Sequence, residues 1–399
     1  MEEILQDLSR QTINNILGVA EEKMNLLIVA PAFPPDRRVG AVRMGSLARY
    51  LLKKNVSITV ITNRKSSIDV DVSKYVYVDI LESGRYSEKF EKNEQLYLDA
   101  FNKETDAGEY DTVIVSGGPF YTFSIAKSAK IKGIPCILDF RDPWIFDYRE
   151  AKEFFSPKKL YTKAKELPKE RAAVKAASAV VTVTDGWKRD FEKCYPSQKD
   201  KFFTILNGYD DELLTNLQRA EFDSQGKKII GVFGKLFYYT EQYSKVFLNG
   251  IKALSNSFTI LQIGEKEENA EQLMSECAVP LDTLESTGFL PYKEGIEYLM
   301  NADVLLIIDV RASAIGTKIY DYIFLGKPII FVGPKTTQFA KIVGSIRGNY
   351  VCSTENEVTT AFKEILLKKK NISANNGEID NYARSAQNER WWQLLNGKL

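Results

Sequence analysis

The feature that most restricts the fold of this chain is an alternation of short, continuous apolar runs with longer segments of helical periodicity. The runs in the first half are rich in aliphatic and β-branched residues, and turn-forming or polar residues follow them. A strand that is apolar on both faces and is separated from the next strand by a helix indicates a parallel sheet covered by helices on both sides. The expected strands of this half are 25–30, 56–62, 111–115, 135–140 and 179–183.

A second series of the same kind follows the turn-forming pair Asn207-Gly208. Because 399 residues exceed what a single hydrophobic core usually organises, we predict two domains. The expected strands of the second series are 228–233, 258–263, 304–308 and 328–332. The predicted parts are an amphipathic helix at 1–23, a first Rossmann-like domain at 24–207, a second at 208–378, and a C-terminal helix at 379–399 that packs back on the first domain.

Composition removes several classes of function. The chain is 44% hydrophobic, carries a formal net charge of +1 and contains no histidine, so no charge excess indicates nucleic acid and no Ser-His-Asp or Cys-His arrangement exists. Its four cysteines are widely spaced, which indicates neither disulfides nor zinc. No apolar stretch reaches the length of a membrane span, and the opening residues are acidic rather than leader-like. We therefore expect a cytoplasmic protein.

In open α/β sheets ligands bind beyond the carboxyl ends of the strands, so the loops after the strands are the candidate sites. The loop 31–43 brings Gly40 and Arg43 to the start of a helix expected at 44–54, where they could contact a phosphate or an acceptor. Arg141, Asp142 and Trp144 follow another strand and could neutralise a phosphate, orient a sugar hydroxyl and stack on a sugar ring. The alternatives are a proline-stiffened connector with solvated arginines, and an Asp-Arg pair beside a packed tryptophan.

In the second half the strongest candidate is the segment that leads into the helix before Gly326-Lys327-Pro328. Gly316, Thr317 and Lys318 would form a phosphate-binding helix end, and Asp321 lies about one turn further, within reach of a ribose. An ordinary capped helix with a solvated lysine is the alternative. Weaker candidates in two other loops are Gly234 and Lys235, which could approach a diphosphate, and Phe289 and Leu290, which could contact a base.

Taken together and in this order, these loops resemble the family 4 retaining glycosyltransferases of GT-B fold, especially the branch that builds bacterial surface polysaccharides such as capsule and lipopolysaccharide. The likeness runs from Met24 onward through LLIVAPAFPPDRRVGAVR, PCILDFRDPW and ILNGYDDE. It implies a GT-B fold, in which two Rossmann-like, doubly wound parallel-sheet domains face a central cleft.

The resemblance also implies roles for particular residues. Asp321 stands where the second acidic residue of the family's E-x7-E motif bonds the donor ribose, and Gly316 and Thr317 would present N–H groups to the diphosphate. The other donor-site residues that it implies are Gly234 and Lys235 beside the β-phosphate, with Phe289 and Leu290 beside the base.

The chain departs from the family pattern at three places. Ser313 replaces the first acidic residue of E-x7-E, and Thr240 replaces a second basic residue, for which Lys318 is the expected substitute. Arg141-Asp142 stands where the family often has His-Asp. We interpret these departures as those of a divergent enzyme.

The expected activity is therefore retaining, metal-independent transfer of a hexosyl or N-acetylhexosaminyl group from a UDP- or GDP-sugar to a glycan or lipid-pyrophosphate acceptor. Lys235 and Lys318 would stabilise the leaving diphosphate, while Arg141 and Asp142 would act on the acceptor side. No cofactor is expected. Two alternatives stay open: a catalytically silent nucleotide-sugar-binding subunit of a polysaccharide assembly complex, and a sugar-nucleotide epimerase of the same fold.

One segment could bring the protein to a membrane surface. Residues 156–178 hold seven Lys or Arg against two Glu, and two phenylalanines precede them. Such a segment, 154–178 in all, could contact anionic lipid peripherally on the inner face of the cytoplasmic membrane. A solvated basic helix is the equal alternative.

Overall fold

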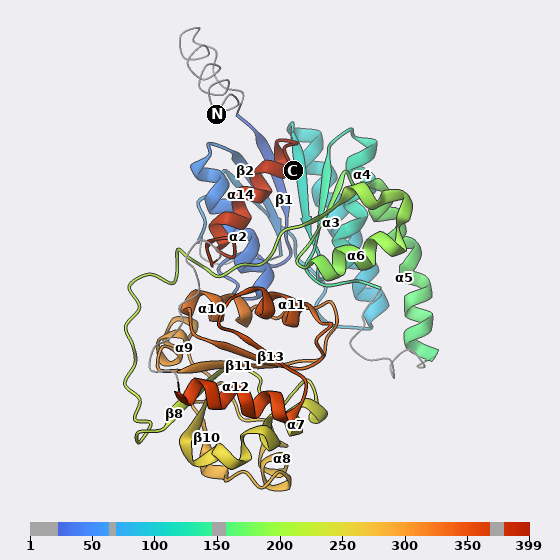
Figure 1. Cartoon of the computed structure of the whole chain (residues 1–399). Helices are drawn as coiled ribbons and strands as arrows, with labels where there is room; N and C mark the ends of the chain where they lie inside the picture. Colours follow the sequence, from blue (N-terminus) through green and yellow to red (C-terminus); the bar gives the residue numbers. More distant parts are fainter. Residues whose placement is uncertain (1–22, 64–68, 146–156, 368–378) are drawn as a thin grey trace. The chain divides into compact units, whose positions relative to one another are not determined.

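The structure is a computed structural model that describes residues 23–63, 69–145, 157–367 and 379–399 (Figure 1). Its first sheet has the strand order β3-β2-β1-β4-β5-β6-β7, and the pairs that β1 forms with β2 and β4 are parallel. The strands are β1 (Asn25–Val29), β2 (Ser57–Thr62), β3 (Lys74–Tyr77), β4 (Thr112–Ser116), β5 (Cys136–Phe140), β6 (Ala179–Thr182) and β7 (Phe202–Thr204).

Helices follow most of these strands, as the alternating sequence pattern predicts. The parallel strands β1 and β2 are joined through α2, and β4 and β5 through α4, which is the geometry of βαβ units. The helices are α2 (Val39–Lys53), α3 (Tyr86–Ala107), α4 (Ile125–Ile131), α5 (Pro157–Ala176) and α6 (Asp185–Cys194).

The second sheet has the order β10-β9-β8-β11-β12-β13, and all of its neighbouring strands are parallel. Its strands are β8 (Lys228–Phe233), β9 (Phe258–Ile263), β10 (Leu284–Ser286), β11 (Val304–Ile308), β12 (Ile329–Val332) and β13 (Tyr350–Cys352). The helices of this half are α7 (Glu241–Ile251), α8 (Ala270–Glu276), α9 (Tyr292–Leu299), α10 (Lys318–Leu325), α11 (Gln338–Ser345) and α12 (Glu355–Leu367), followed by α14 (Arg384–Leu395).

The apolar side chains of the second sheet enter two buried clusters, one on each face. Alternate residues along a strand point to opposite faces, so Ile230 and Val232 join one cluster while Ile229 joins the other. All of β11 is buried, and a strand buried on both faces needs apolar side chains on both, which explains its fully apolar sequence.

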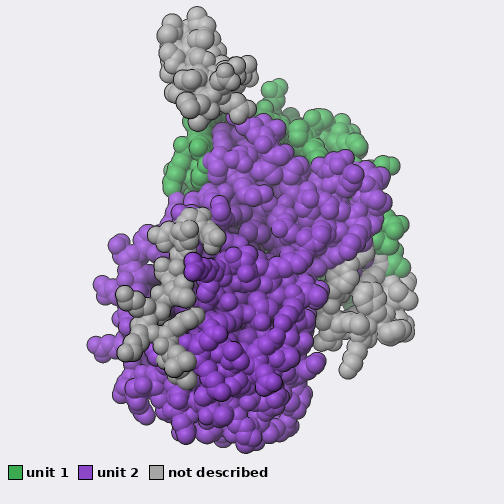
Figure 2. Space-filling view, viewed as in Figure 1, with its two compact units in different colours: residues 1–144, 162–180 green, residues 145–161, 181–399 purple. Residues whose placement is uncertain are grey.

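The chain divides into two compact units, one of residues 1–144 and 162–180 and the other of residues 145–161 and 181–399 (Figure 2). The boundary falls inside β6, so α6, β7 and α14 belong to the second unit. Asn207, where the sequence predicts the domain boundary, lies within that unit.

Each sheet has a topological switch point, at which the order in which successive strands are added reverses. In the first sheet this switch lies between β1 and β4, and in the second it lies between β8 and β11. The connections leave in opposite directions there, which opens a crevice at the carboxyl ends of the two strands. The loops after these four strands are therefore where the fold itself places a ligand.

The helix predicted at 1–23 lies outside the described residues, apart from its last position. Residues 154–156 of the basic segment also lie outside them, and α5 covers most of the remainder. Within the described part of the chain, none of the helices has the length and apolar character needed to cross a membrane.

Candidate functional site

The loop after β8 begins at the switch point of the second sheet with a sharp backbone turn at Gly234. This residue has a φ of +72°, which favours glycine, and its N–H donates to the Ile263 carbonyl at 2.7 Å. The Gln262 side chain donates to the Gly234 carbonyl at 2.9 Å. Lys235 follows as an exposed residue. The sequence prediction that this glycine-lysine pair directly follows the strand is confirmed.

Lys318, which comes after the loop that follows β11, contacts the loop after β8. Its Nζ donates to the Lys235 carbonyl at 2.9 Å, although the two residues are 83 positions apart. Burial lowers the pKa of Lys318 to about 8, and the nearby guanidinium of Arg311 adds to that shift, while Asp309 and Glu267 oppose it. A bound anion would favour the charged form of this lysine.

Asp309 and Arg311 form a rigid pair beside Lys318. Asp309 is fully buried, and Arg311 binds it through Nε at 3.1 and 3.0 Å and through Nη2 at 2.6 Å. The guanidinium carbon of Arg311 also lies 4.1 Å from the centre of the Tyr239 ring. None of these three residues is identified by the sequence analysis. The position of Asp309 directly after a buried strand is the signal that could have found it.

Asp321 lies in the first turn of α10 and is 6% exposed. Tyr292 donates its hydroxyl to Asp321 Oδ1 at 2.5 Å. Burial raises the pKa of this carboxyl to about 7, and the nearby Asp210 contributes in the same direction, whereas Tyr292 and Arg384 act against the shift. A carboxyl group that titrates near neutrality beside a cation site is a functional-site candidate.

The other predicted donor-site residues differ in exposure. Gly316 and Thr317 are half-buried and come just before α10, which begins at Lys318 rather than at Gly316. Phe289 is 85% exposed, whereas Leu290 packs against the core of the second sheet. Phe289 is therefore the side chain of this pair that is open to a planar ligand.

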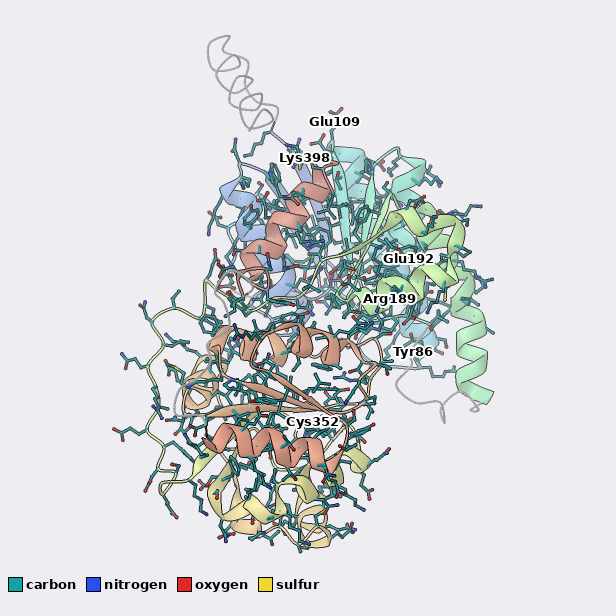
Figure 3. All side chains as sticks on the ribbon, viewed as in Figure 1. Tyr86, Glu109, Arg189, Glu192, Cys352 and Lys398 are labelled. Atoms are coloured by element: carbon teal, nitrogen blue, oxygen red, sulfur yellow. The ribbon has the colours of Figure 1, made fainter. Side chains whose placement is uncertain are left out.

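The two positions that depart from the family pattern have structural partners. Thr240 begins α7 by accepting a hydrogen bond from the Tyr243 backbone N–H at 3.3 Å. Ser313 donates to Asp190 Oδ2 at 2.6 Å, and its carbonyl accepts from Thr184 at 2.8 Å. Asp190 belongs to α6, the helix that also carries Arg189 and Glu192 (Figure 3).

In the first sheet, Arg43 does not occupy the open position that the sequence suggests. The helix α2 begins at Val39, five residues earlier than expected, so Arg43 lies in its second turn and is only 4% exposed. Its Nε and Nη2 each lie 3.2 Å from Asp139 Oδ1, and Ser116 donates to Oδ2 of the same carboxylate at 3.3 Å. Arg43 is therefore a buried structural partner of Asp139, and an acceptor role does not fit its burial.

Arg141 spans the switch point of the first sheet. Its Nη2 donates to the carbonyls of Gly117 and Gly118 in the loop after β4. A Cβ atom at Gly40 would lie 2.2 Å from the Arg141 guanidinium, so a glycine is needed at the start of α2. Arg141 Nε is buried without a hydrogen-bond partner among the described residues, and burial lowers the pKa of this arginine. Asp142, the next residue, is exposed.

Trp144 belongs to an aromatic cluster rather than standing open to a sugar. Its ring stacks on Phe120 at a centroid distance of 5.4 Å and on Phe90 at 5.9 Å. Its Nε1 donates to Glu166 of α5 at 2.8 Å. The packed-tryptophan alternative describes this geometry better than sugar stacking does.

In the described part of the basic helix α5, some basic side chains contact the rest of the same unit and others are exposed. Lys169 pairs with Glu94 at 2.6 Å and lies 4.6 Å from the centre of the Phe90 ring. Arg171 is exposed. The described residues hold no cluster of three or more carboxylate or cysteine side chains that could bind a metal ion.

Part of this sequence matches a family of known proteins, and solved structures share its fold. The model of Glycosyltransferase Family 4 matches residues 40–213, somewhat less than half of the chain. A search of curated proteins found no match.

Many solved structures match the chain, and the following three are among those that cover nearly all of it. A glycosyltransferase from Rickettsia africae has a TM-score of 0.63 at 12% identity and covers 95% of this chain and 99% of its own. HepE from Anabaena, in complex with UDP, has a TM-score of 0.62 at 14% identity, with 94% and 100% covered. A putative UDP-N-acetylglucosamine 2-epimerase from Listeria monocytogenes has a TM-score of 0.58 at 12% identity, with 93% and 95% covered. The chain therefore has the GT-B fold, as the sequence predicts.

Proposed function

We propose that this chain is a family 4 glycosyltransferase that moves a sugar from a UDP- or GDP-sugar to a glycan or lipid-linked acceptor in surface polysaccharide biosynthesis. The transferred group is a hexosyl or N-acetylhexosaminyl unit, and the stereochemistry at its anomeric carbon is retained. The family match over residues 40–213 and the GT-B fold support this proposal. The likeness to HepE, which is solved with UDP, supports a nucleotide-sugar donor.

One observation carries the proposal: a cation stands at the switch point of the second sheet, and a buried carboxyl group follows it in the first turn of the same helix. Lys318 Nζ bonds the backbone of Lys235 at the turn after β8, and Asp321 lies one turn further along the same helix. The Lys318 ammonium suits the two phosphates of a nucleoside diphosphate, and the Asp321 carboxyl suits the hydroxyls of its ribose.

The proposed chemistry is stabilisation of the leaving diphosphate while the glycosidic bond breaks through an oxocarbenium-like state. Lys235 and Lys318 offset the charge that develops on the diphosphate, and we propose that they do so without a metal ion. The departing phosphate accepts the proton of the acceptor hydroxyl. Arg141 and Asp142 position the acceptor.

The acceptor and the place of action complete the proposal. A lipid-pyrophosphate acceptor would bring the protein to the inner face of the cytoplasmic membrane, and exposed basic residues of α5 such as Arg171 suit an anionic surface. Binding to vesicles with and without anionic lipid, compared between the wild type and Arg171→Glu, tests this part separately.

Thermal unfolding with UDP, GDP, ADP and AMP tests the donor site directly. A ligand that binds only the folded state raises its stability, so one nucleoside diphosphate is expected to raise the melting temperature. Lys318→Ala and Asp321→Asn are expected to remove most of that shift. Lys341→Ala is the matched control, because Lys341 is exposed on the neighbouring helix α11.

Turnover then separates the classes of function. Transfer of a labelled sugar to a membrane extract supports the transferase. Binding without turnover indicates a silent subunit, and no stabilisation by any of the four nucleotides would refute a nucleotide-sugar site altogether.

A sugar-nucleotide epimerase is the second candidate, favoured by the structural likeness to the Listeria monocytogenes protein. It would convert its substrate in the absence of an acceptor. Incubation of the purified protein with UDP-N-acetylglucosamine alone, followed by chromatography of the products, distinguishes the two activities.

A further inference from the structure

Arg311 is held in one orientation at the switch point of the second sheet. Its backbone N–H donates to Asp309 at 2.8 Å, and its side chain binds the carboxylate of the same residue through Nε and Nη2. The Tyr239 ring lies against the guanidinium at 4.1 Å. Even so, 22% of the Arg311 side chain is exposed. This guanidinium is therefore preorganised and open at the edge where the fold places a ligand.

Arg311 lies near a second cation, Lys318, at the switch point of the second sheet. A Cβ atom on Gly316 would lie only 3.6 Å from Arg311 Nη2, and Gly316 stands two residues before Lys318. Burial is the main cause of the lowered pKa of Lys318, and the charge of Arg311 contributes in the same direction. Asp309 and Glu267 are the acidic groups that face this lysine.

Asp309 already stands beside both cations, since it binds Arg311 through Nε and Nη2 and acts to raise the pKa of Lys318. Both cations nevertheless stand at the switch point, where N–H groups of each can be offered to an anionic ligand. The Asp309–Arg311 pair alone would explain how the loop is held, but it does not require Lys318 beside it. A ligand with two adjacent phosphates offers one charged group to each cation, whereas a monophosphate offers only one.

We propose that Arg311 is a second cation of the donor site, and that Arg311 and Lys318 together make the site prefer nucleoside diphosphates to nucleoside monophosphates. This inference rests on the proposed function, because it concerns the same site. It adds a residue and a source of substrate selectivity to that site.

Calorimetric titration of the full chain with UDP, UMP, GDP and GMP tests the inference. The wild type is expected to bind one diphosphate at least tenfold more tightly than its monophosphate. Arg311→Met is expected to weaken the diphosphate by about tenfold to a hundredfold, the usual range for a charge-assisted hydrogen bond, and to change the monophosphate little. Arg347→Met is the control, because Arg347 is exposed in the loop after α11.

A pH series gives a second readout, which reports whether the charge of Arg311 acts on Lys318 within the site. Without Arg311, the pKa of Lys318 should rise, so the decline of diphosphate affinity at alkaline pH should begin at a higher pH than in the wild type. Arg311→Lys should keep part of the preference, because it keeps the charge but loses the planar fork.

The outcomes are distinct. Equal weakening of diphosphate and monophosphate, or no weakening of either, overturns the role of Arg311 while leaving the nucleotide site intact. If the wild type binds none of the nucleotides, the proposed function itself fails. Arg311→Met leaves Asp309 buried without its partner, so the double variant Asp309→Asn/Arg311→Met provides the same comparison if the single variant does not fold.

Discussion

Replacing Asp321 with asparagine should make the protein more stable and less able to bind a nucleotide. The carboxyl group is 6% exposed, and burial raises its pKa from 3.8 to about 7. Because the folded pKa is the higher one, the folded state holds the proton more tightly than the unfolded chain does. Stability from this group is fully present below pH 3.8 and is lost as the pH rises to about 7.

The magnitude follows from the size of the shift. A difference of about three pKa units, at about 1.4 kcal/mol per unit, is an upper bound of about 4 kcal/mol. Asparagine has no charge to lose and can still accept the hydrogen bond from Tyr292. From pH 5 to pH 7 the free energy of unfolding of the variant should therefore rise relative to that of the wild type by roughly 1.4 kcal/mol per pH unit. This difference in stability should level off above about pH 7.

Urea denaturation followed by circular dichroism at several pH values between 5 and 8.5 measures this difference. Hydrogen exchange of the α10 amides assigns it to the second sheet, which matters because a chain with two units can unfold in steps. Asp282→Asn is the control, since Asp282 is exposed. A stability difference that does not vary with pH would mean that Asp321 ionises equally in both states, and the reasoning would be wrong. Stabilisation without loss of nucleotide binding would remove Asp321 from the site.

Three further outcomes are expected. Stabilisation of the wild type by a nucleoside diphosphate should decline as the pH rises through about 8, because Lys318 then loses its charge; Lys318→Arg should remove this decline, and an unchanged pH profile in that variant would contradict the assignment. Asp139→Ala should lower the free energy of unfolding by about 3–5 kcal/mol, because it leaves the guanidinium of Arg43 buried without its carboxylate; a urea midpoint equal to that of the wild type would show that the pair contributes nothing. Phe289→Ala should change stability by less than about 0.5 kcal/mol, since the ring is 85% exposed, yet weaken nucleotide binding; equal affinity in titration would exclude base stacking at this position.

The sequence determined the elements that are buried on both faces. The expected strands 228–233, 258–263 and 304–308 coincide with β8, β9 and β11, because a fully apolar run bounded by polar residues has few other ways to be buried. The edge strands β3, β7, β10 and β13 were missed. They are only three or four residues long and are partly exposed, so none of them gives a signal as strong as that of a long buried strand.

The start of α2 was predicted five residues late. Its first turn contains no acidic residue and its first residue, Val39, follows Arg38, which makes no side-chain cap hydrogen bond. The usual signals of a helix start are therefore missing from the sequence. Contacts of Gly40 with Arg141 show instead that tertiary packing supports this turn.

What the tertiary structure alone decided is which loop residues meet. The sequence identified Lys235, Lys318 and Asp321 as candidates because each follows a strand or begins a helix. It did not reveal that Lys318 bonds the Lys235 backbone across 83 residues, or that Arg43 is buried against Asp139 across 96. The order of strands in a sheet brings distant loops together, and that order is not encoded in local periodicity. The sequence thus contains the chemistry of the site, whereas the strand order determines which groups can act together.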